Sequence, residues 1–76
     1  MQLEKFIENF AGQFEETDAK EFKAETVFSE LEEWSSFTSL SIIAMVDEEY
    51  NVKIKGAEIR SCKTIGEIYA IVTARS

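Results

Sequence analysis

Apolar residues recur at helical spacing along this 76-residue chain, which contains no proline and only three glycines. Near the N-terminus they follow the i, i+3, i+4, i+7 pattern that places side chains on one face of an α-helix. This stripe predicts a first helix that ends near Glu15. Its members are Leu3, Phe6, Ile7, Phe10 and Phe14. Strand-type alternation is scarce, so the sequence predicts an all-α fold.

Three further helices are predicted. Ser35 is a favoured N-cap, because its hydroxyl can accept a hydrogen bond from a first-turn N–H group. It precedes an apolar-rich helix over residues 37–50, and a short helix is predicted over residues 57–61. The longer helix is predicted to carry one apolar stripe, widened by Ile42 and Met45, whose members are Leu40, Ile43, Ala44, Val46 and Tyr50. The sequence Thr64-Ile65-Gly66-Glu67 matches a capping box that starts the last helix. We therefore expect a small four-helix bundle, with three main helices and one short third helix, in a single domain of all 76 residues.

Residues 16–35 have no stable helical period and predict an irregular connection. A connection of this length in a compact domain is often functional. Its aromatic residues indicate that it packs over the core, and residues 28–31 are expected to form a single helical turn. Trp34 is expected to staple the start of the following helix, and Cys62 to be a buried thiol.

Charge is unevenly distributed along the chain. Residues 1–50 hold thirteen acids and three bases, a balance of −10, whereas residues 51–76 hold two acids and five bases, a balance of +3. The net charge is −7. An acidic surface repels nucleic acid and favours basic protein partners, so we expect no nucleic-acid binding.

Two residue types that catalysis and metal binding often use are absent or scarce, although carboxylates are plentiful. There is no histidine, the commonest general base near neutral pH, and there is one cysteine. A structural zinc site is excluded on the same grounds. The acids of residues 47–49 are not followed by the alternating oxygen ligands and glycine of a calcium loop. We expect neither an enzyme nor a metal site.

Compartment is indicated by what the chain does not contain. One cysteine cannot form an intrachain disulfide, which suits a reducing cytosol. The first residues show no basic region followed by an apolar run, as a signal peptide would, and no apolar stretch approaches the roughly 20 residues that span a bilayer. We expect a soluble, cytoplasmic monomer with no membrane span.

The segment from Trp34 to Tyr50 resembles the second helix of acyl carrier proteins. In that family an Asp-Ser-Leu motif opens the helix, aliphatic residues follow, and an acidic cluster ending in an aromatic residue closes it. Ser35-Ser36-Phe37 stands at the motif, and Asp47-Glu48-Glu49-Tyr50 at the close. The resemblance covers essentially the whole chain, including its length, its acidity and the order of its helices. Further matching positions are Leu40, Ile42, Ile43, Val46, Ile54, Ile59, Cys62, Thr64 and Ile65.

The resemblance implies that Ser36 is the attachment site of 4′-phosphopantetheine, a prosthetic group that a phosphopantetheinyl transferase takes from coenzyme A. The terminal thiol of this group holds acyl intermediates as thioesters. The implied partners are the transferase and acyl-transferring or acyl-modifying enzymes with basic docking patches. They would act in fatty acid, lipid or specialised acyl or polyketide biosynthesis.

A second register of the motif exists, because Thr38-Ser39-Leu40 also resembles Asp-Ser-Leu. Starting the motif at Ser39 would place Glu49 at a buried aliphatic position of the family and would move the closing aromatic residue out of step. Starting it at Ser36 satisfies both positions. We therefore predict modification at Ser36.

Several motif positions depart from the family pattern. Ser35 replaces the aspartate, Phe37 replaces the leucine, and Thr38 and Ser41 stand where fatty-acid-synthesis members often have acids. These differences favour a dedicated carrier for a specialised pathway. The residues expected to contact partners are Phe37, Ser41, Asp47 and Glu48. The residues expected to line the space for an acyl chain are Val46, Ile54 and Ile59.

Two alternatives remain open from the sequence. The same fold could carry aminoacyl or peptidyl groups, which would differ only in the enzyme that loads the thiol. The chain could also be an unmodified helical adaptor that binds a partner through its acidic surface.

Overall fold

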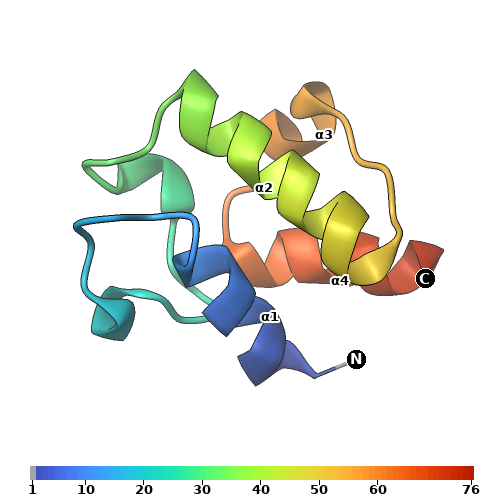
Figure 1. Ribbon diagram of the computed structural model, residues 1–76, viewed down its shortest axis with the longest axis horizontal. Helices are drawn as coiled ribbons and strands as arrows, with labels where there is room; N and C mark the ends of the chain where they lie inside the picture. The colour runs from blue at the N-terminus through green and yellow to red at the C-terminus, as the bar shows by residue number, and fades with distance from the viewer. Residues whose placement is uncertain (1) are drawn as a thin grey trace.

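The computed structural model describes residues 2–76, and its described part is a small, mostly helical domain with four α-helices and no strands (Figure 1). Two single 3₁₀ turns, η1 (Ala19–Glu21) and η2 (Phe28–Glu30), lie in the connection between the first two helices. The all-α prediction is confirmed at this level. The helices are α1 (Leu3–Ala11), α2 (Ser36–Tyr50), α3 (Gly56–Ser61) and α4 (Ile65–Arg75).

Helix α1 ends earlier than its apolar stripe predicts. Its last residue is Ala11, and Gly12 follows as the C-cap. The chain then tightens into successive turns, in which Gln13 N donates to Phe10 O at 3.1 Å and Phe14 N donates to Ala11 O at 3.0 Å. Phe14 is nevertheless buried, so the stripe continues in space after the helix has ended. The predicted end near Glu15 is therefore wrong.

Helix α2 has the predicted N-cap and the predicted end. The Ser35 hydroxyl accepts a hydrogen bond from Thr38 N at 3.2 Å. At the other end, Asn51 adopts a left-handed conformation, with φ of 55°, and its N–H donates to Asp47 O at 3.0 Å. Asparagine tolerates this conformation better than most residues other than glycine. The helix begins at Ser36, one residue before the predicted start.

The face of α2 that enters the core differs from the predicted one. The apolar pattern predicts one wide stripe that includes Leu40, but Leu40 lies exposed on the surface. Because α2 is apolar around most of its circumference, the pattern of apolar residues does not define its inner face. The buried residues of the helix are Thr38, Ile42, Met45 and Val46.

The α3 and α4 helices follow the expected order. Helix α3 begins at Gly56, one residue before its predicted start, and the N–H of Lys55 donates to the Glu58 carboxylate at 3.0 Å. At the start of α4 the predicted capping box is confirmed. Thr64 Oγ1 accepts from Glu67 N, and the Glu67 carboxylate accepts from Thr64 N, both at 3.2 Å.

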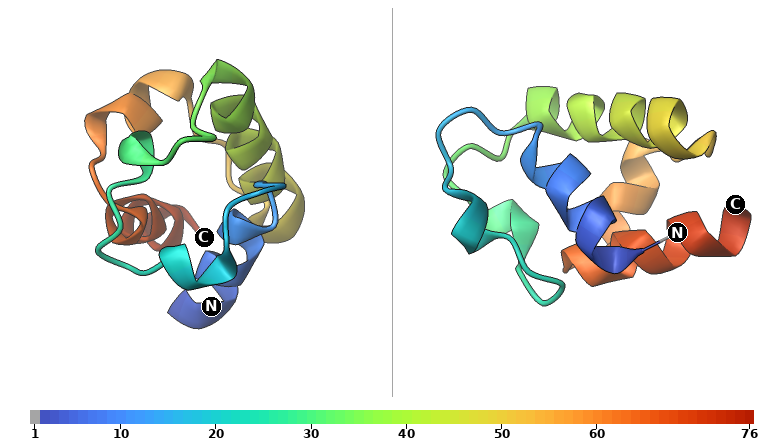
Figure 2. Two further views of the ribbon diagram at one scale, coloured as in Figure 1. Left: turned by 90° about the vertical axis from the view of Figure 1, so that its left-hand side faces the viewer. Right: turned by 60° about the horizontal axis from the view of Figure 1, so that its bottom comes forward.

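The arrangement of the helices encloses one core. Helix α1 contacts both α2 and α4, and the right-hand view of Figure 2 shows it between them, while α3 contacts α2. The connection between α1 and α2 lies at one end of the helices (Figure 1). It contributes Phe22 and Phe28 to the core, as its aromatic residues predict. The most deeply buried side chains are Phe6, Phe10, Phe28, Ile42, Val46, Ile59, Ile65, Ile68 and Val72.

The connection is also tied to the start of α4 through backbone hydrogen bonds. Gly66 N donates to Ala24 O at 2.8 Å, and Ile65 N donates to Thr26 O at 3.2 Å. A bridge between Val27 and Thr64 continues the contact. The sequence predicts this segment to be irregular, and these bonds hold it in a fixed position. None of the helices in residues 2–76 is long and apolar enough to cross a membrane.

Candidate functional site

Ser36 is the first residue of α2, and its side chain is exposed. Its hydroxyl makes no hydrogen bond to any of the residues 2–76. The preceding Ser35 occupies the N-cap and uses its own hydroxyl on Thr38 N. The two neighbouring serines therefore differ in role, because one caps the helix while the other presents an uncommitted hydroxyl to solvent. An anion attached there would lie beside the positive end of the α2 dipole.

The start of α2 is held in place by Thr38. This residue is 6% exposed, and its Oγ1 donates to Glu33 O at 2.8 Å. The Glu33 carboxylate in turn accepts hydrogen bonds from the N–H groups of Glu15 at 3.1 Å and Glu16 at 2.9 Å, and from Thr17 Oγ1. The bond from Thr17, together with those from the backbone, lowers the pKa of Glu33 from its ordinary value of 4.5. Glu33 thus links the first turn of α2 to the residues that follow α1.

Trp34 packs beside this turn, but not as the predicted staple. A staple would place it against the fourth residue of α2, which is the polar Ser39. Its ring instead lies 4.7 Å from Phe28 and 6.4 Å from Phe14, measured between ring centroids. The indole joins the aromatic cluster of the core.

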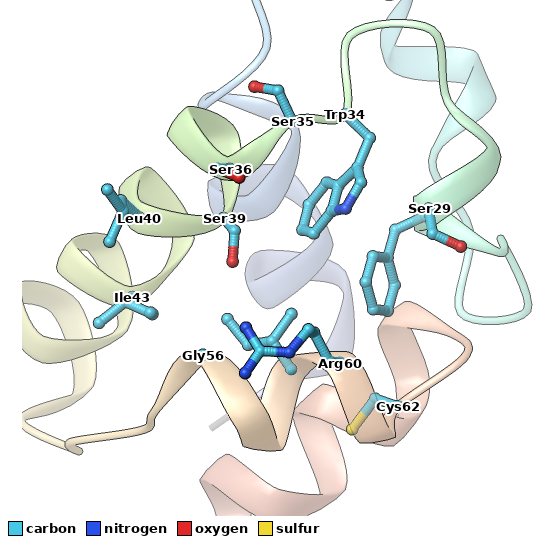
Figure 3. Close-up of a pocket in the computed structure, with 12 residues that line it drawn as sticks. Ser29, Trp34, Ser35, Ser36, Ser39, Leu40, Ile43, Gly56, Arg60 and Cys62 are labelled. Carbon is cyan, nitrogen blue, oxygen red and sulfur yellow. The ribbon is translucent and has the colours of Figure 1, made fainter.

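An open pocket of about 680 Å³ lies beside Ser36, between α2, α3 and the segment before α2. Figure 3 shows its two facing walls and the Trp34 side chain at one end. Most of the lining is apolar. Helix α2 contributes Ser36, Ser39, Leu40 and Ile43, and the preceding segment contributes Phe28, Ser29, Trp34 and Ser35. The α3 side contributes Gly56, Ile59, Arg60 and Cys62.

Ser39, the alternative attachment site, lines the same pocket. It lies one turn into α2 and is half-buried, whereas Ser36 is exposed. Its hydroxyl likewise makes no hydrogen bond within the described part of the chain. The two serines therefore differ in access and in their distance along the helix from its N-terminus.

Only one of the three residues expected to line an acyl-chain space faces the pocket. Ile59 lines it from α3. Val46 and Ile54 are buried in the core and do not reach the pocket. They remain predictions for a chain that enters the interior of the bundle.

Cys62 is half-buried at the pocket and not fully buried as predicted. Its burial raises the pKa of the thiol, and the nearby Glu67 carboxylate adds to the effect. A thiol with a raised pKa is mostly protonated at neutral pH and is a poor nucleophile.

The outer face of α2 combines apolar and acidic side chains. Phe37 is 77% exposed and Leu40 is 63% exposed. Phe37 was predicted as a contact residue, whereas Leu40 was assigned to the helix stripe. Nothing in the local sequence separates Leu40 from its buried neighbours, because the helix is apolar on several sides.

The other predicted contact residues differ in how free they are. Ser41 is half-buried and donates to Phe37 O at 3.3 Å. The Asp47 carboxylate pairs with Lys53 Nζ at 3.2 Å, so part of its charge is neutralised within the chain. Glu48 is exposed and makes no ion pair with residues 2–76. Glu48 therefore offers the freer charge to a partner.

Comparisons of the chain with protein-family models, with curated proteins and with solved structures give no match.

Proposed function

We propose that this protein is a carrier of acyl groups and that Ser36 bears 4′-phosphopantetheine. The observation that carries the proposal is the exposed, uncommitted hydroxyl of Ser36 at the start of α2, beside an apolar pocket. The resemblance of the chain to acyl carrier proteins supports the same serine. A short, acidic, helical chain without histidine fits a protein that presents a group to enzymes and does not catalyse a reaction itself.

The attachment chemistry fits the surroundings of Ser36. Its hydroxyl oxygen would form a bond to the pantetheine-bearing phosphorus of coenzyme A while the pyrophosphate P–O bond breaks and adenosine 3′,5′-bisphosphate leaves. The hydroxyl proton would pass to the transferase. Because the transferase supplies the base, the chain needs no histidine beside the serine. The phosphodiester that forms is an anion, and the first turn of α2 favours an anion. Ser36 is more accessible than Ser39 to an enzyme that must surround the reacting hydroxyl.

The carried group would be an acyl thioester on the terminal thiol of the arm. The pocket beside Ser36 is mostly apolar, with walls that include Trp34, Leu40, Ile43 and Ile59. Such a lining favours the burial of aliphatic or aromatic carbon. The function therefore belongs to fatty acid, lipid or specialised acyl biosynthesis.

Docking to partner enzymes is assigned to the outer face of α2. Phe37 and Leu40 supply exposed apolar surface, and Glu48 supplies charge for basic patches. Charge pairs at the edge of an interface mainly speed association and weaken in salt. Replacing Glu48 with lysine is expected to slow association with a partner transferase at low salt, measured by stopped-flow or surface plasmon resonance. An unchanged association rate would contradict this docking face.

The test of modification is intact-mass spectrometry after incubation with coenzyme A and a broad-specificity phosphopantetheinyl transferase. The wild-type protein is expected to gain one phosphopantetheine. The Ser36→Ala variant is expected to gain none, while Ser39→Ala, the matched control one turn away, gains one. Circular dichroism of each variant checks that the helices are intact.

Other outcomes would redirect the assignment. A gain that is lost in Ser39→Ala and kept in Ser36→Ala would move the attachment site to Ser39. No gain with several transferases would leave the unmodified acidic adaptor as the remaining function. A gain followed by loading with amino acids, and not with fatty or other acyl groups, would identify an aminoacyl or peptidyl carrier.

A further inference from the structure

Three of the eight cations form ion pairs within residues 2–76, and Arg60 is one of the five that do not. Lys5 pairs with Glu8, Lys53 pairs with Asp47, and Arg75 pairs with Glu58. Arg60 makes no ion pair and no hydrogen bond to residues 2–76, although the chain carries a net charge of −7. A guanidinium that stays unpaired in so acidic a protein is available to an external anion.

The guanidinium of Arg60 faces the pocket beside Ser36. Figure 3 shows it over α3, on the side of Gly56, with Ser39 and Ile43 on the facing wall. Glycine leaves room for it, because a Cβ atom at position 56 would come within 3.3 Å of Arg60 Nη1. Arg60 is the only charged residue among the described residues that line the pocket. The pocket therefore has one cation, no acid, and Ser36 on its opposite wall.

We propose that Arg60 pairs with the phosphodiester of the phosphopantetheine arm on Ser36 and holds the first part of the arm against the pocket. This inference depends on the proposed modification of Ser36. A guanidinium can donate two parallel N–H bonds to phosphate oxygens, a geometry that lysine does not offer. Because Arg60 is exposed, such a pair is partly screened by solvent and by salt, and its contribution is modest.

The pairing gives Arg60 a role in positioning. It directs the arm along the pocket between α2 and α3 and away from Phe37, which is exposed on the outer face of α2 and does not line the pocket. Leu40 lies at the rim that the pocket shares with that face. The docking face then stays free while the arm lies in the pocket. Weakening of the pair, by a partner that supplies its own cation for the phosphate, would release the arm.

The test is phosphorus NMR of the loaded protein, with loading verified by intact mass for every variant. The ³¹P resonance of the wild-type phosphodiester is expected to move as sodium chloride is raised, because salt screens the pair. In Arg60→Gln the ³¹P resonance should lie, already at low salt, where the wild-type resonance lies at high salt. It should then respond little to added salt. Arg60→Lys keeps the charge but lacks the two parallel N–H donors. Its salt response should lie between those of the wild type and Arg60→Gln. Lys63→Gln is the matched control, since Lys63 is a nearby cation that does not line the pocket.

A second readout does not depend on the NMR signal. Loading should raise the midpoint of thermal unfolding more in the wild type and in Lys63→Gln than in Arg60→Gln. The difference between these rises should be about 2–4 °C, as for an exposed pair in a domain of this size. Equal salt responses and equal midpoint gains in Arg60→Gln and Lys63→Gln would overturn the pairing and leave the modification of Ser36 intact. Absence of any mass gain in the wild type would overturn both.

Discussion

Three hydroxyl residues at the start of α2 have three different roles. Ser35 accepts the bond that caps the helix, Ser36 is exposed and unbonded, and Thr38 is buried with its hydroxyl on Glu33 O. The difference follows from where each side chain lies relative to the first turn of the helix. A residue-by-residue substitution series can therefore separate stability from modification.

Replacing Ser35 with alanine is expected to destabilise the protein by about 1 kcal/mol, because Thr38 N loses its capping partner. Ser36→Ala should change the free energy of unfolding by less than about 0.5 kcal/mol, because the Ser36 hydroxyl bonds to none of the described residues. Urea denaturation followed by circular dichroism measures both values. Equal losses in the two variants would contradict these assignments.

The Glu33 carboxylate couples stability to acid. Its pKa is lowered by the hydrogen bonds from Thr17, Glu15 and Glu16, so the folded protein favours the ionised form more than the unfolded chain does. The stabilisation is fully present above the ordinary pKa of 4.5 and is lost as pH falls through the lowered value. In Glu33→Gln the free energy of unfolding should therefore fall less steeply than in the wild type as the pH drops below 4.5.

The matched control for Glu33 is Glu32→Gln, which changes an exposed neighbour with no hydrogen bond in the described chain. The free energy of unfolding of each variant is measured across the acid range. If Glu33→Gln and Glu32→Gln follow the same curve as the wild type, the hydrogen bonds to Glu33 do not contribute to the pH dependence.

Among the elements, the connection between α1 and α2 depends most on tertiary contacts. Its residues lack a helical period, yet backbone bonds from Ile65 and Gly66 fix it to the start of α4. The side chain of Glu33 fixes its other part. Sequence patterns describe periodic segments, and they do not show which carboxylate or carbonyl will meet a distant N–H group.

Gly66 is required where the connection meets α4. A Cβ atom there would lie 3.1 Å from Ala24 O, the acceptor of the Gly66 N–H bond of 2.8 Å. We expect Gly66→Ala to destabilise the protein by about 1 kcal/mol. The added Cβ would crowd Ala24 O and weaken its hydrogen bond with the N–H of residue 66, and this loss outweighs the gain in helix propensity. Gly12→Ala, in a right-handed conformation with its nearest described contact at 3.4 Å, should be neutral or slightly stabilising.

Thermal unfolding of the two glycine variants measures this difference. A Gly66→Ala variant that is as stable as Gly12→Ala would mean that the connection moves away from α4 without loss of stability.

Prediction at the scale of elements succeeded where the local signals agree. The N-cap at Ser35 and the capping box at Thr64 fix their helix starts through bonds within one turn, and both are confirmed. The end of α1 was misplaced because Phe14 continues the apolar pattern after Gly12 has ended the helix. The inner face of α2 was misassigned because only packing against α1 and α3 decides which apolar side chains are covered.

At the scale of the whole molecule, one aromatic cluster joins the helices to the connection. Phe10 lies within 6.4 Å of the ring centroids of Phe6, Phe14, Phe22 and Phe28. These rings come from α1, from the turns after it and from the connection. The cluster holds the segment before α2 in place and thereby one end of the pocket, which Phe28 and Trp34 line.

The candidate site could be predicted in part. Ser36 and Ile59 were singled out from the sequence, and both line the pocket. Arg60 and Gly56 were not, because they reach the site only through the packing of α3 against α2. Their sequence neighbourhood contains no signal beyond a short helix. The local motif thus indicated the proposed attachment residue, whereas the residues of the opposite wall could be found only from the fold.

The attachment of phosphopantetheine to Ser36 is tested by tandem mass spectrometry of the tryptic peptide that spans residues 24–53. The peptide is taken from protein treated with coenzyme A and transferase. This peptide contains both Ser36 and Ser39. We expect fragment ions that locate one phosphopantetheine on Ser36 and none on Ser39. A peptide that remains unmodified with several transferases, or that bears the group on Ser39, would contradict attachment to Ser36.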